Sequence, residues 1–336
     1  MCSNFQLYIA IDFCENAILF VTAGASFNRS AFPIKKAFHC NLFSFQSGLS
    51  SLHSTSSSMK KFTLELVFHI IGIGSASGLF YQNDLLYLIG DNSSYLYEYN
   101  VKNSNLAKYP LLQNPADNIE KISKPDFESI THYQDSLYIF GSGSTSNRNR
   151  MIEFSLPQKE KIQTNNMVDI YAIMQSFASI KETDFNLEGA SYDGEFWYFF
   201  NRGTNDSNKN TVLTLKAKKL DQEFALMSND YKLPKLKGVR TSFTDGLIVG
   251  DKLYFLAAAE NTKSTYEDGE ILGSIIGRID IESMKIDFTK TISTTNKFEG
   301  LTVYKQDGKQ ITFLLCEDKD NNENESDIFK LTLDLK

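Results

Sequence analysis

Five short segments of the chain share one order of residue types: an acidic or hydroxyl residue, a small residue and an apolar residue. They read Ser77-Gly78-Leu79, Glu128-Ser129-Ile130, Glu188-Gly189-Ala190, Asp245-Gly246-Leu247 and Glu299-Gly300-Leu301. If the first residues of these segments converge, four carboxylates and a hydroxyl surround one point. Close carboxylates cannot all remain ionised without a cation, because each raises the pKa of the others. The sequence therefore predicts a metal site with Ser77, Glu128, Glu188, Asp245 and Glu299 as ligands.

The ligand types indicate which metal such a site would hold. Calcium accepts roughly six to eight oxygen ligands at relaxed geometry, and these segments offer oxygen ligands. They contain no cysteine or histidine, which argues against zinc, copper and iron. The alternative interpretation is structural: the segments are a repeated turn in which each carboxylate accepts backbone N–H bonds.

A second set of polar residues follows the first set at nearly constant offsets. Asp91, Ser142 and Arg202 each lie 13 residues after the small residue of their segment, and Glu260 lies 14 after Gly246. In the fifth repeat the corresponding residues are Glu317 and Asp318. An arginine beside a metal can hold a phosphate through two hydrogen bonds, and a carboxylate can act as a base toward water. We therefore expect Arg202 to bind phosphate and Asp91 or Glu317 to be the base, unless these residues are only polar hairpin ends.

The elements that must position both sets are strands. The small residues Gly78, Ser129, Gly189, Gly246 and Gly300 are 51, 60, 57 and 54 residues apart. A recurrence of this length is typical of a β-propeller, in which each repeat is one small antiparallel sheet around a central channel. Each segment is followed by aromatic and β-branched runs, such as residues 85–89 and 196–200, which are strand signals. The chain is therefore predicted to be an all-β, five-bladed propeller of four-stranded blades.

The fifth repeat supplies only three strands before the chain ends, and residues 62–70 supply the fourth. Pairing these two parts of the chain would close the ring and remove exposed sheet edges.

One further segment, about residues 166–181, has apolar residues at helical spacing: Met167, Ile170, Tyr171, Met174, Phe177 and Ala178. We expect a helix that packs on the propeller surface, with a lid as the alternative. His132 lies on an inner strand, where we expect a hydrogen-bonded core histidine.

Residues 1–58 have no place in this ring, so residues 59–336 are predicted to form one propeller domain. The leading segment holds Cys2, Cys14 and Cys40 and ends in a hydroxyl-rich run directly before Met59-Lys60-Lys61, a typical bacterial start. We interpret it as a non-native upstream extension or a disordered leader. The alternative is a targeting segment, although the residues before its apolar stretch lack the basic character of a signal peptide. These two interpretations imply a cytoplasmic and an exported protein, respectively.

Charge and hydropathy restrict the partners. The net charge of −7 argues against a nucleic acid or an anionic membrane as the main ligand. No apolar run reaches the roughly 20 residues that cross a bilayer. We expect a monomer whose propeller top face binds a small anionic ligand or a protein.

The order of ligand types resembles that of a known family. Ser, Glu, Glu, hydroxyl or acid, and Glu on five successive inner strands is similar to the calcium-activated nucleotidases (apyrases), which are five-bladed propellers with a central calcium. The aromatic strand that ends in Asn201-Arg202 is also similar to that family's strand ending in Pro-Arg. The chain lacks the family's arginine after the Asp91 turn, and residues 141–148 replace its Gly-Lys-Glu-Trp turn. The repeated segments also resemble phytase-like propellers and an uncharacterised bacterial propeller family.

Two functions are compatible with these patterns. The first is a propeller whose calcium stabilises the ring and whose top face binds a ligand or partner. The second is a calcium-dependent hydrolase of phosphoesters or phosphoanhydrides, which the resemblance to apyrases implies. Fold alone does not separate them.

Overall fold

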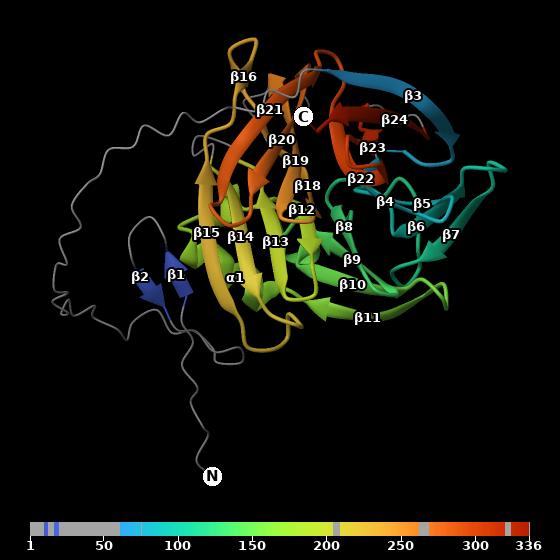
Figure 1. Cartoon of the computed structure of the whole chain (residues 1–336). Coiled ribbons are helices and arrows are strands. Elements are labelled where there is room, and N and C mark those ends of the chain that lie inside the picture. The colour runs from blue at the N-terminus through green and yellow to red at the C-terminus, as the bar shows by residue number, and fades with distance from the viewer. Residues whose placement is uncertain are drawn as a thin grey trace, which may run out of the picture.

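A computed structural model describes residues 10–12, 17–19, 61–74, 76–203, 209–261, 269–319 and 324–335. It confirms a five-bladed β-propeller of four-stranded antiparallel blades (Figure 1). The inner strands of the five blades are β4 (Ala76–Gln82), β8 (Phe127–Tyr133), β12 (Leu187–Tyr192), β18 (Ser242–Val249) and β22 (Phe298–Gln306). Each inner strand contacts the inner strand of the next blade, and β22 contacts β4, so the ring is closed around a channel.

Each blade continues outward from its inner strand in chain order. The first blade is completed by β5 (Leu85–Gly90), β6 (Tyr95–Asn100) and β7 (Leu106–Pro110). The second contains β9 (Ser136–Gly141), β10 (Arg150–Ser155) and β11 (Glu160–Asn166). The third contains β13 (Phe196–Asn201), β14 (Asn210–Lys216) and β15 (Ala225–Tyr231). The fourth blade contains β19 (Lys252–Asn261), β20 (Glu270–Asp280) and β21 (Lys285–Ser293). Short pairs also occur, namely β1 (Ala10–Asp12) with β2 (Ala17–Leu19), and β16 (Lys235–Leu236) with β17 (Val239–Arg240).

The predicted closure of the ring is confirmed. The fifth blade consists of β22, β23 (Gln310–Glu317), β24 (Glu325–Asp334) and β3 (Phe62–Ile71), in that order. Strand β3 pairs antiparallel with β24 from Phe62 opposite Leu333 to Ile71 opposite Glu325. Figure 1 shows the blue β3 beside the red β24, so the first and last strands of the propeller share one sheet.

Apolar side chains fill the spaces between neighbouring blades. Between the fourth and fifth blades, Leu256 and Ile276 pack with Phe298 and Phe313, all fully buried. Because both faces of the middle strands are covered in this way, those strands read as continuous apolar runs rather than alternating ones. The single cysteine of the described region, Cys316, is buried in the same manner and is not in a disulfide.

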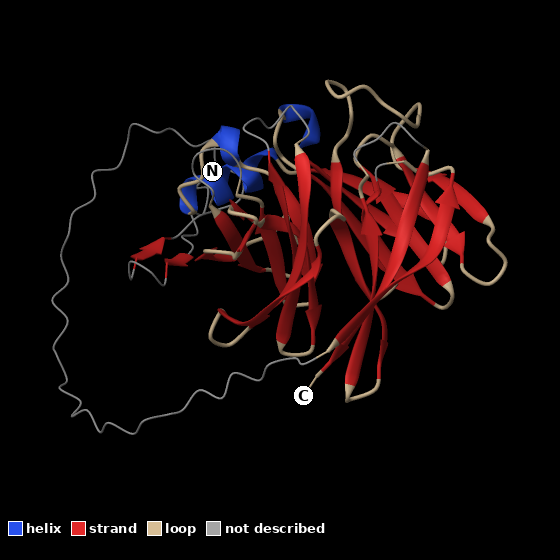
Figure 2. Cartoon of the chain, turned by 90° about the horizontal axis from the view of Figure 1, so that it is seen from above, coloured by secondary structure: helices blue, strands red, loops and turns tan. Residues whose placement is uncertain are grey.

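The predicted helix is present but shorter than expected, as α1 (Val168–Phe177), and a short 3-10 helix, η2 (Glu182–Asp184), follows it. A second short 3-10 helix, η1 (Ser146–Arg148), lies in the second blade. Met167, Tyr171 and Met174 are buried in one apolar cluster with residues of the second and third blades, and the Tyr171 hydroxyl donates to the Gly141 carbonyl at 2.9 Å. The helix therefore packs as part of the core, and Figure 2 shows the helical segments gathered at one end of the strands.

Most of residues 1–58 lie outside the described residues, so their predicted role as an extension, leader or targeting segment stays a prediction. No helix in the described part of the chain is long and apolar enough to cross a membrane.

Candidate metal centre at one end of the channel

The five inner strands share a β-bulge near their first residue. In each blade the pairing between the first and second strands skips one residue, which has no partner opposite it. The skipped residues are Ser77, Glu128, Glu188, Thr244 and Glu299. A bulge re-aims the side chain of its extra residue, and five equivalent bulges in a ring repeat that aim around one axis. These five residues, which we call the bulge ring, therefore occupy equivalent positions at one end of the channel.

Asp245, which the sequence predicted as a ligand with these residues, does not occupy a bulge. Asp245 is paired with Leu256 one residue beyond the bulge, and its carboxylate accepts backbone N–H bonds from Gly246 and Leu301, both at 2.7 Å. Burial raises the pKa of Asp245, and the two N–H bonds oppose this rise. Asp245 thus ties β18 to β22, and Thr244 holds the ring position.

The misassignment came from using the small residue as the marker of each segment. A better marker is the buried apolar residue before the bulge, because Phe127-Glu128, Phe243-Thr244 and Phe298-Glu299 follow one pattern. The small residues have a separate, steric cause. A Cβ on Gly189 would lie 2.6 Å from the backbone nitrogen of Gly246, so adjacent inner strands approach too closely for a side chain there.

The two hydroxyls of the bulge ring have their protons engaged by the neighbouring blade. Ser77 donates to the carbonyl of Phe127, and Thr244 donates to the carbonyl of Phe298 at 2.7 Å. A hydroxyl oxygen also has two acceptor lone pairs. Because each proton is committed to a backbone carbonyl, both oxygens keep lone pairs for a cation.

The three carboxylates of the bulge ring are in unequal surroundings. Glu188 accepts hydrogen bonds from Asn186 at 2.5 Å and Arg202 at 3.3 Å, and Glu299 is paired with Lys297 at 3.1 Å. Glu128 has neither a hydrogen bond nor an ion pair from any described residue. Burial raises the pKa of Glu128 well above its ordinary value, and the nearby carboxylates of Asp126 and Glu188 raise it further.

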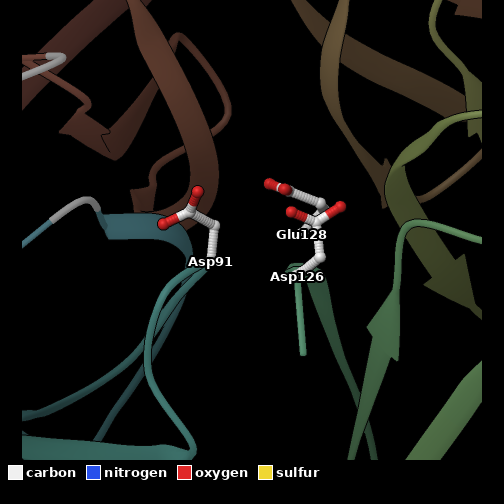
Figure 3. Close-up of side chains that lie close together, drawn as sticks. All are labelled: Asp91, Asp126 and Glu128. Carbon is white, nitrogen blue, oxygen red and sulfur yellow. The ribbon is translucent and has the colours of Figure 1, made fainter. Parts of the chain in front are cut away.

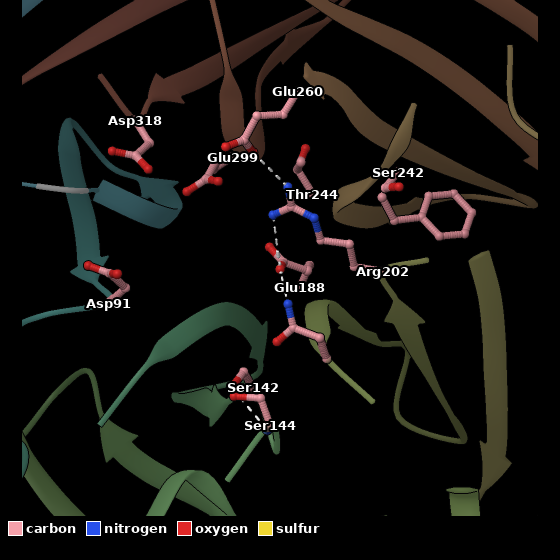
Figure 4. Close-up of polar contacts among 12 residues, drawn as sticks. Asp91, Ser142, Ser144, Glu188, Arg202, Ser242, Thr244, Glu260, Glu299 and Asp318 are labelled. Atoms are coloured by element: carbon pink, nitrogen blue, oxygen red, sulfur yellow. Dashed lines mark hydrogen bonds and ion pairs between the residues drawn. The ribbon is translucent and has the colours of Figure 1, made fainter. Parts of the chain in front are cut away.

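Arg202 bridges two acidic residues of different blades. Its Nη1 lies 3.3 Å from Glu188 and its Nη2 lies 3.1 Å from Glu260, and Figure 4 shows the guanidinium between them. Lys297 similarly lies 3.1 Å from Glu299, 3.3 Å from Asp318 and 3.8 Å from Glu260. Burial would lower the pKa of Arg202, but the carboxylates of Glu188, Glu260 and Glu299 hold it above its ordinary value.

A separate acidic cluster lies where the first and second blades meet, and Figure 3 shows Asp91 across from Asp126 and Glu128. Carboxylate oxygens of Asp91, Asp126 and Glu128 all lie within 4.8 Å of one another. Lys124 contacts Asp91 and lies 2.8 Å from Asp126, which Arg148 also contacts at 2.7 Å. The Oδ1 atom of Asp91 is buried and has no partner among the described residues. Burial is the main cause that raises the pKa of Asp91.

The residue predicted as a base in the fifth blade, Glu317, does not face this cluster. Glu317 pairs with Phe298 in the sheet and accepts a hydrogen bond from Asn296 at 2.8 Å. The next residue, Asp318, corresponds in register to Asp91, Ser142 and Arg202, which also follow the last paired residue of a second strand. Asp318 contacts Lys297 and raises the pKa of Glu299, so it is the acidic residue of this blade that reaches the channel end.

Carboxylates outnumber cations at this end of the channel. Among the described residues, the acids are Asp91, Asp126, Glu128, Glu188, Glu260, Glu299 and Asp318, and the cations are Lys124, Arg148, Arg202 and Lys297. Seven carboxylates and four cations give these described side chains a net charge of −3 when all are ionised. Such a site favours an added cation or the protonation of some carboxylates.

A family model described as "Family of unknown function (DUF6929)" matches residues 72–333. The chain belongs to this family. The match spans the propeller from the residues just after β3 through β24, and so includes the whole bulge ring. No curated protein matches this DUF6929 member in sequence.

Several solved propellers are similar to the DUF6929 member in fold. They include the major Malassezia sympodialis allergen Mala s 1, with 11% identity, TM-score 0.48 and coverage of 79% of this chain and 96% of that one. The PQQ-bound aldose sugar dehydrogenase of Streptomyces coelicolor has 8% identity, TM-score 0.44 and coverage of 82% and 99%. A DUF4221 member from Bacteroides vulgatus has 11% identity, TM-score 0.39 and coverage of 81% and 97%.

Proposed function

We propose that the protein binds calcium on the bulge ring and uses that end of the channel to bind a small anionic ligand. The observation that carries the proposal is the arrangement of oxygen ligands. One residue from every blade occupies an equivalent bulge, and these residues are three carboxylates and two hydroxyls. Among them Glu128 makes no ion pair with a described residue and has only the more distant charge of Lys124 to oppose the rise of its pKa, and the two hydroxyls have their protons directed elsewhere.

The donor set fits calcium better than other common metals. All five ligands are oxygens, and calcium accepts oxygen ligands at relaxed geometry, whereas zinc and copper prefer nitrogen or sulfur. Carboxylates at this end also exceed cations by three charges, so a divalent ion would compensate most of the excess. Glu128, Glu188 and Glu299 would then be ionised at neutral pH.

The cations beside the ring suggest how a ligand would bind. Arg202 and Lys297 each share a ring carboxylate, Glu188 and Glu299 respectively, with the proposed metal. When the metal attracts these carboxylates, the two cations lose part of their compensation and can pair with an anion. A phosphate group would suit this arrangement, because a guanidinium binds it through two parallel hydrogen bonds and the metal binds another of its oxygens.

Hydrolysis of a phosphoester or phosphoanhydride is the second candidate, and one observation favours it. Asp91 Oδ1 is buried without a partner, and burial raises the pKa of this carboxyl. A carboxylate of that kind can accept the proton of an attacking water while the metal polarises the phosphoryl oxygen. Asp91 would be the base in that reaction, and Arg202 would stabilise the charge on the phosphoryl group.

The experiment is thermal unfolding of the full chain in EDTA, followed by addition of calcium or magnesium. A ligand that binds only the folded state at 100 times its Kd adds about 2.7 kcal/mol of stability. For a domain of this size, that corresponds to a rise in Tm of about 5–10 °C. Glu128→Gln should abolish most of the rise, while Glu160→Gln, the same change on the outer strand of the same blade, should keep it. Equal rises in both variants would refute the calcium site.

A further inference from the structure

A cavity lies in the channel farther along the five inner strands than the bulge ring. It has a volume of about 290 Å³, and all five inner strands contribute residues to its wall. The wall includes His132, Ser191 and Thr302, which lie three or four residues beyond the bulge residue of their strands. At the usual rise per strand residue, this places them roughly 10–13 Å farther along the strand. The cavity is therefore separate from the proposed metal centre.

The chemistry of this cavity is unlike that of the bulge ring. None of its described lining residues carries a formal charge, and Leu79, Ile130, Leu247 and Leu301 form much of its wall. An ion would lose hydration here without gaining an opposite charge, which is unfavourable by several kcal/mol. The cavity therefore selects against charged ligands and accepts an apolar body.

His132 supplies an unsatisfied acceptor. Its imidazole stacks on the ring of Phe80 with centroids 4.4 Å apart and an interplanar angle of 15°. Burial lowers the pKa of His132 and so favours the neutral imidazole, and the Gln134 backbone opposes this shift only in part. The Nε2 atom is buried and has no partner among the described residues. We assign the ring proton to Nδ1, on the side of the Gln134 backbone, and this tautomer leaves a lone pair on Nε2 that can accept a proton donor.

Two hydroxyls supply the complementary donors. Ser191 Oγ accepts the backbone N–H of Ile248 at 2.9 Å, and Thr302 Oγ1 accepts that of Tyr81 at 3.2 Å. Both contacts use an oxygen lone pair and leave the hydroxyl proton without an acceptor in the described structure. The same wall thus combines one free acceptor with two free donors.

We propose that this cavity binds a small neutral molecule with an apolar body and a hydroxyl or N–H group that donates to His132 Nε2. Where that group is a hydroxyl, its oxygen would also accept a hydrogen bond from Ser191 or Thr302. The size is appropriate, because a cavity of about 150 Å³ holds benzene and a volume about twice as large holds a substituted aromatic ring. A phenol or a comparable alcohol satisfies each of these conditions.

The test uses 4-ethylphenol as the probe and the histidine side-chain resonances of the full chain as the readout. The sequence has four histidines, so ¹H–¹⁵N correlations of the imidazoles are few, and loss of one in His132→Phe identifies His132. We expect 4-ethylphenol to shift the His132 Nε2 resonance saturably. The methyl ether 4-ethylanisole, which lacks the donor, should bind about three- to tenfold more weakly, the usual effect of one lost neutral hydrogen bond. The anion 4-ethylbenzoate should not bind.

Two variants keep the proposal falsifiable. His132→Phe preserves the ring stacked on Phe80 and removes the acceptor, so affinity measured by saturation-transfer NMR should fall by the same factor. Ser191→Ala tests the donor and leaves the histidine resonance as a readout, and His69→Gln is a control on the outer strand β3. The proposal would be overturned if 4-ethylphenol produced no saturable shift, or if 4-ethylphenol and 4-ethylanisole bound with equal affinity. Water would then be the hydrogen-bond partner of His132 Nε2. Running the titrations in EDTA and in calcium separates this result from failure of the metal site.

Discussion

Thr244 donates its hydroxyl proton to the carbonyl oxygen of Phe298 at 2.7 Å, and Phe298 directly precedes Glu299. Ser77 and Phe127, which precedes Glu128, are related in the same way across the first two blades. Each hydroxyl of the bulge ring thus fixes the backbone that presents a carboxylate of the next blade. The hydroxyls therefore position the neighbouring carboxylates of the bulge ring and keep lone pairs of their own.

The first prediction separates Thr244 from Asp245. Thr244→Val keeps the shape of the side chain and removes its oxygen, so the rise in Tm that calcium produces should be smaller. Asp245→Asn should keep the calcium-dependent rise and lower stability by about 1–3 kcal/mol, because an amide can serve only one of the two backbone N–H groups well. Thermal unfolding with EDTA and with calcium measures both. The reverse pattern would restore Asp245 as the ligand.

The second prediction concerns Arg202, which lies between Glu188 and Glu260. Removing one partner of a buried ion pair leaves an uncompensated charge and costs about 3–5 kcal/mol. We expect Arg202→Met to lose this stability in EDTA and to regain part of it in calcium, because the metal would compensate Glu188. The calcium-dependent rise in Tm should therefore exceed that of the wild type. An identical loss under both conditions would contradict a metal at Glu188.

The third prediction concerns pH and the closing strand. His69 on β3 lies 2.7 Å from Asp327 and 3.1 Å from Glu325 of β24. The hydrogen bond to Asp327 is the main cause that raises the pKa of His69, and the charge of Glu325 adds to it. A raised pKa in the folded state stabilises the fold below the unfolded pKa of about 6.5, and the effect is lost as the pH rises through the folded value.

His69→Gln should accordingly destabilise the protein at pH 5.5 and have little effect at pH 8.5, as measured by urea denaturation. The matched control is Lys330→Gln, which removes a 2.8 Å ion pair with Glu65 from the same two strands. That pair contains no histidine, so its loss should be similar at both pH values. A His69→Gln effect that is equal at both values would show that the imidazole is neutral in the fold.

The fourth prediction tests the packing of α1. Gly143 has a φ of +76°, and a Cβ on it would lie 2.7 Å from the rings of both Phe185 and Tyr171. Gly143→Ala should lower stability by about 1–3 kcal/mol beyond the cost of the backbone angle, because the aromatic rings must move. Gly250→Ala isolates that backbone cost, since Gly250 has a φ of +62° and no atom within 4 Å of the added carbon. Similar losses in the two variants would mean that α1 yields easily.

The sequence predicts the blades well because each strand repeats one pattern of apolar and aromatic residues. The closing strand β3 and the helix were predictable for the same reason, the first from a missing strand and the second from a change of period. Side-chain direction was harder, because one bulged residue changes which neighbour faces the channel. The small-residue marker therefore indicated Asp245 where the bulged residue is Thr244. In the fifth blade Glu317 was chosen as the base, although Asp318, predicted beside it, is the residue that contacts Lys297. His132 was expected to be a hydrogen-bonded core histidine, and the lack of a partner for its Nε2 depends on packing that no spacing encodes.

The sharing of the fifth blade between β3 and β24 has a consequence for synthesis of the protein. Strand β3 leaves the ribosome first among the strands of the propeller, yet its hydrogen-bonding partner is the last, so the two ends meet only after every blade has been translated. Contacts so distant in sequence slow folding. Until that meeting, the direct contacts between β22 and β4 lack the support of the shared fifth blade. If the proposed calcium site exists, we therefore expect it to form only after β24 has been synthesised.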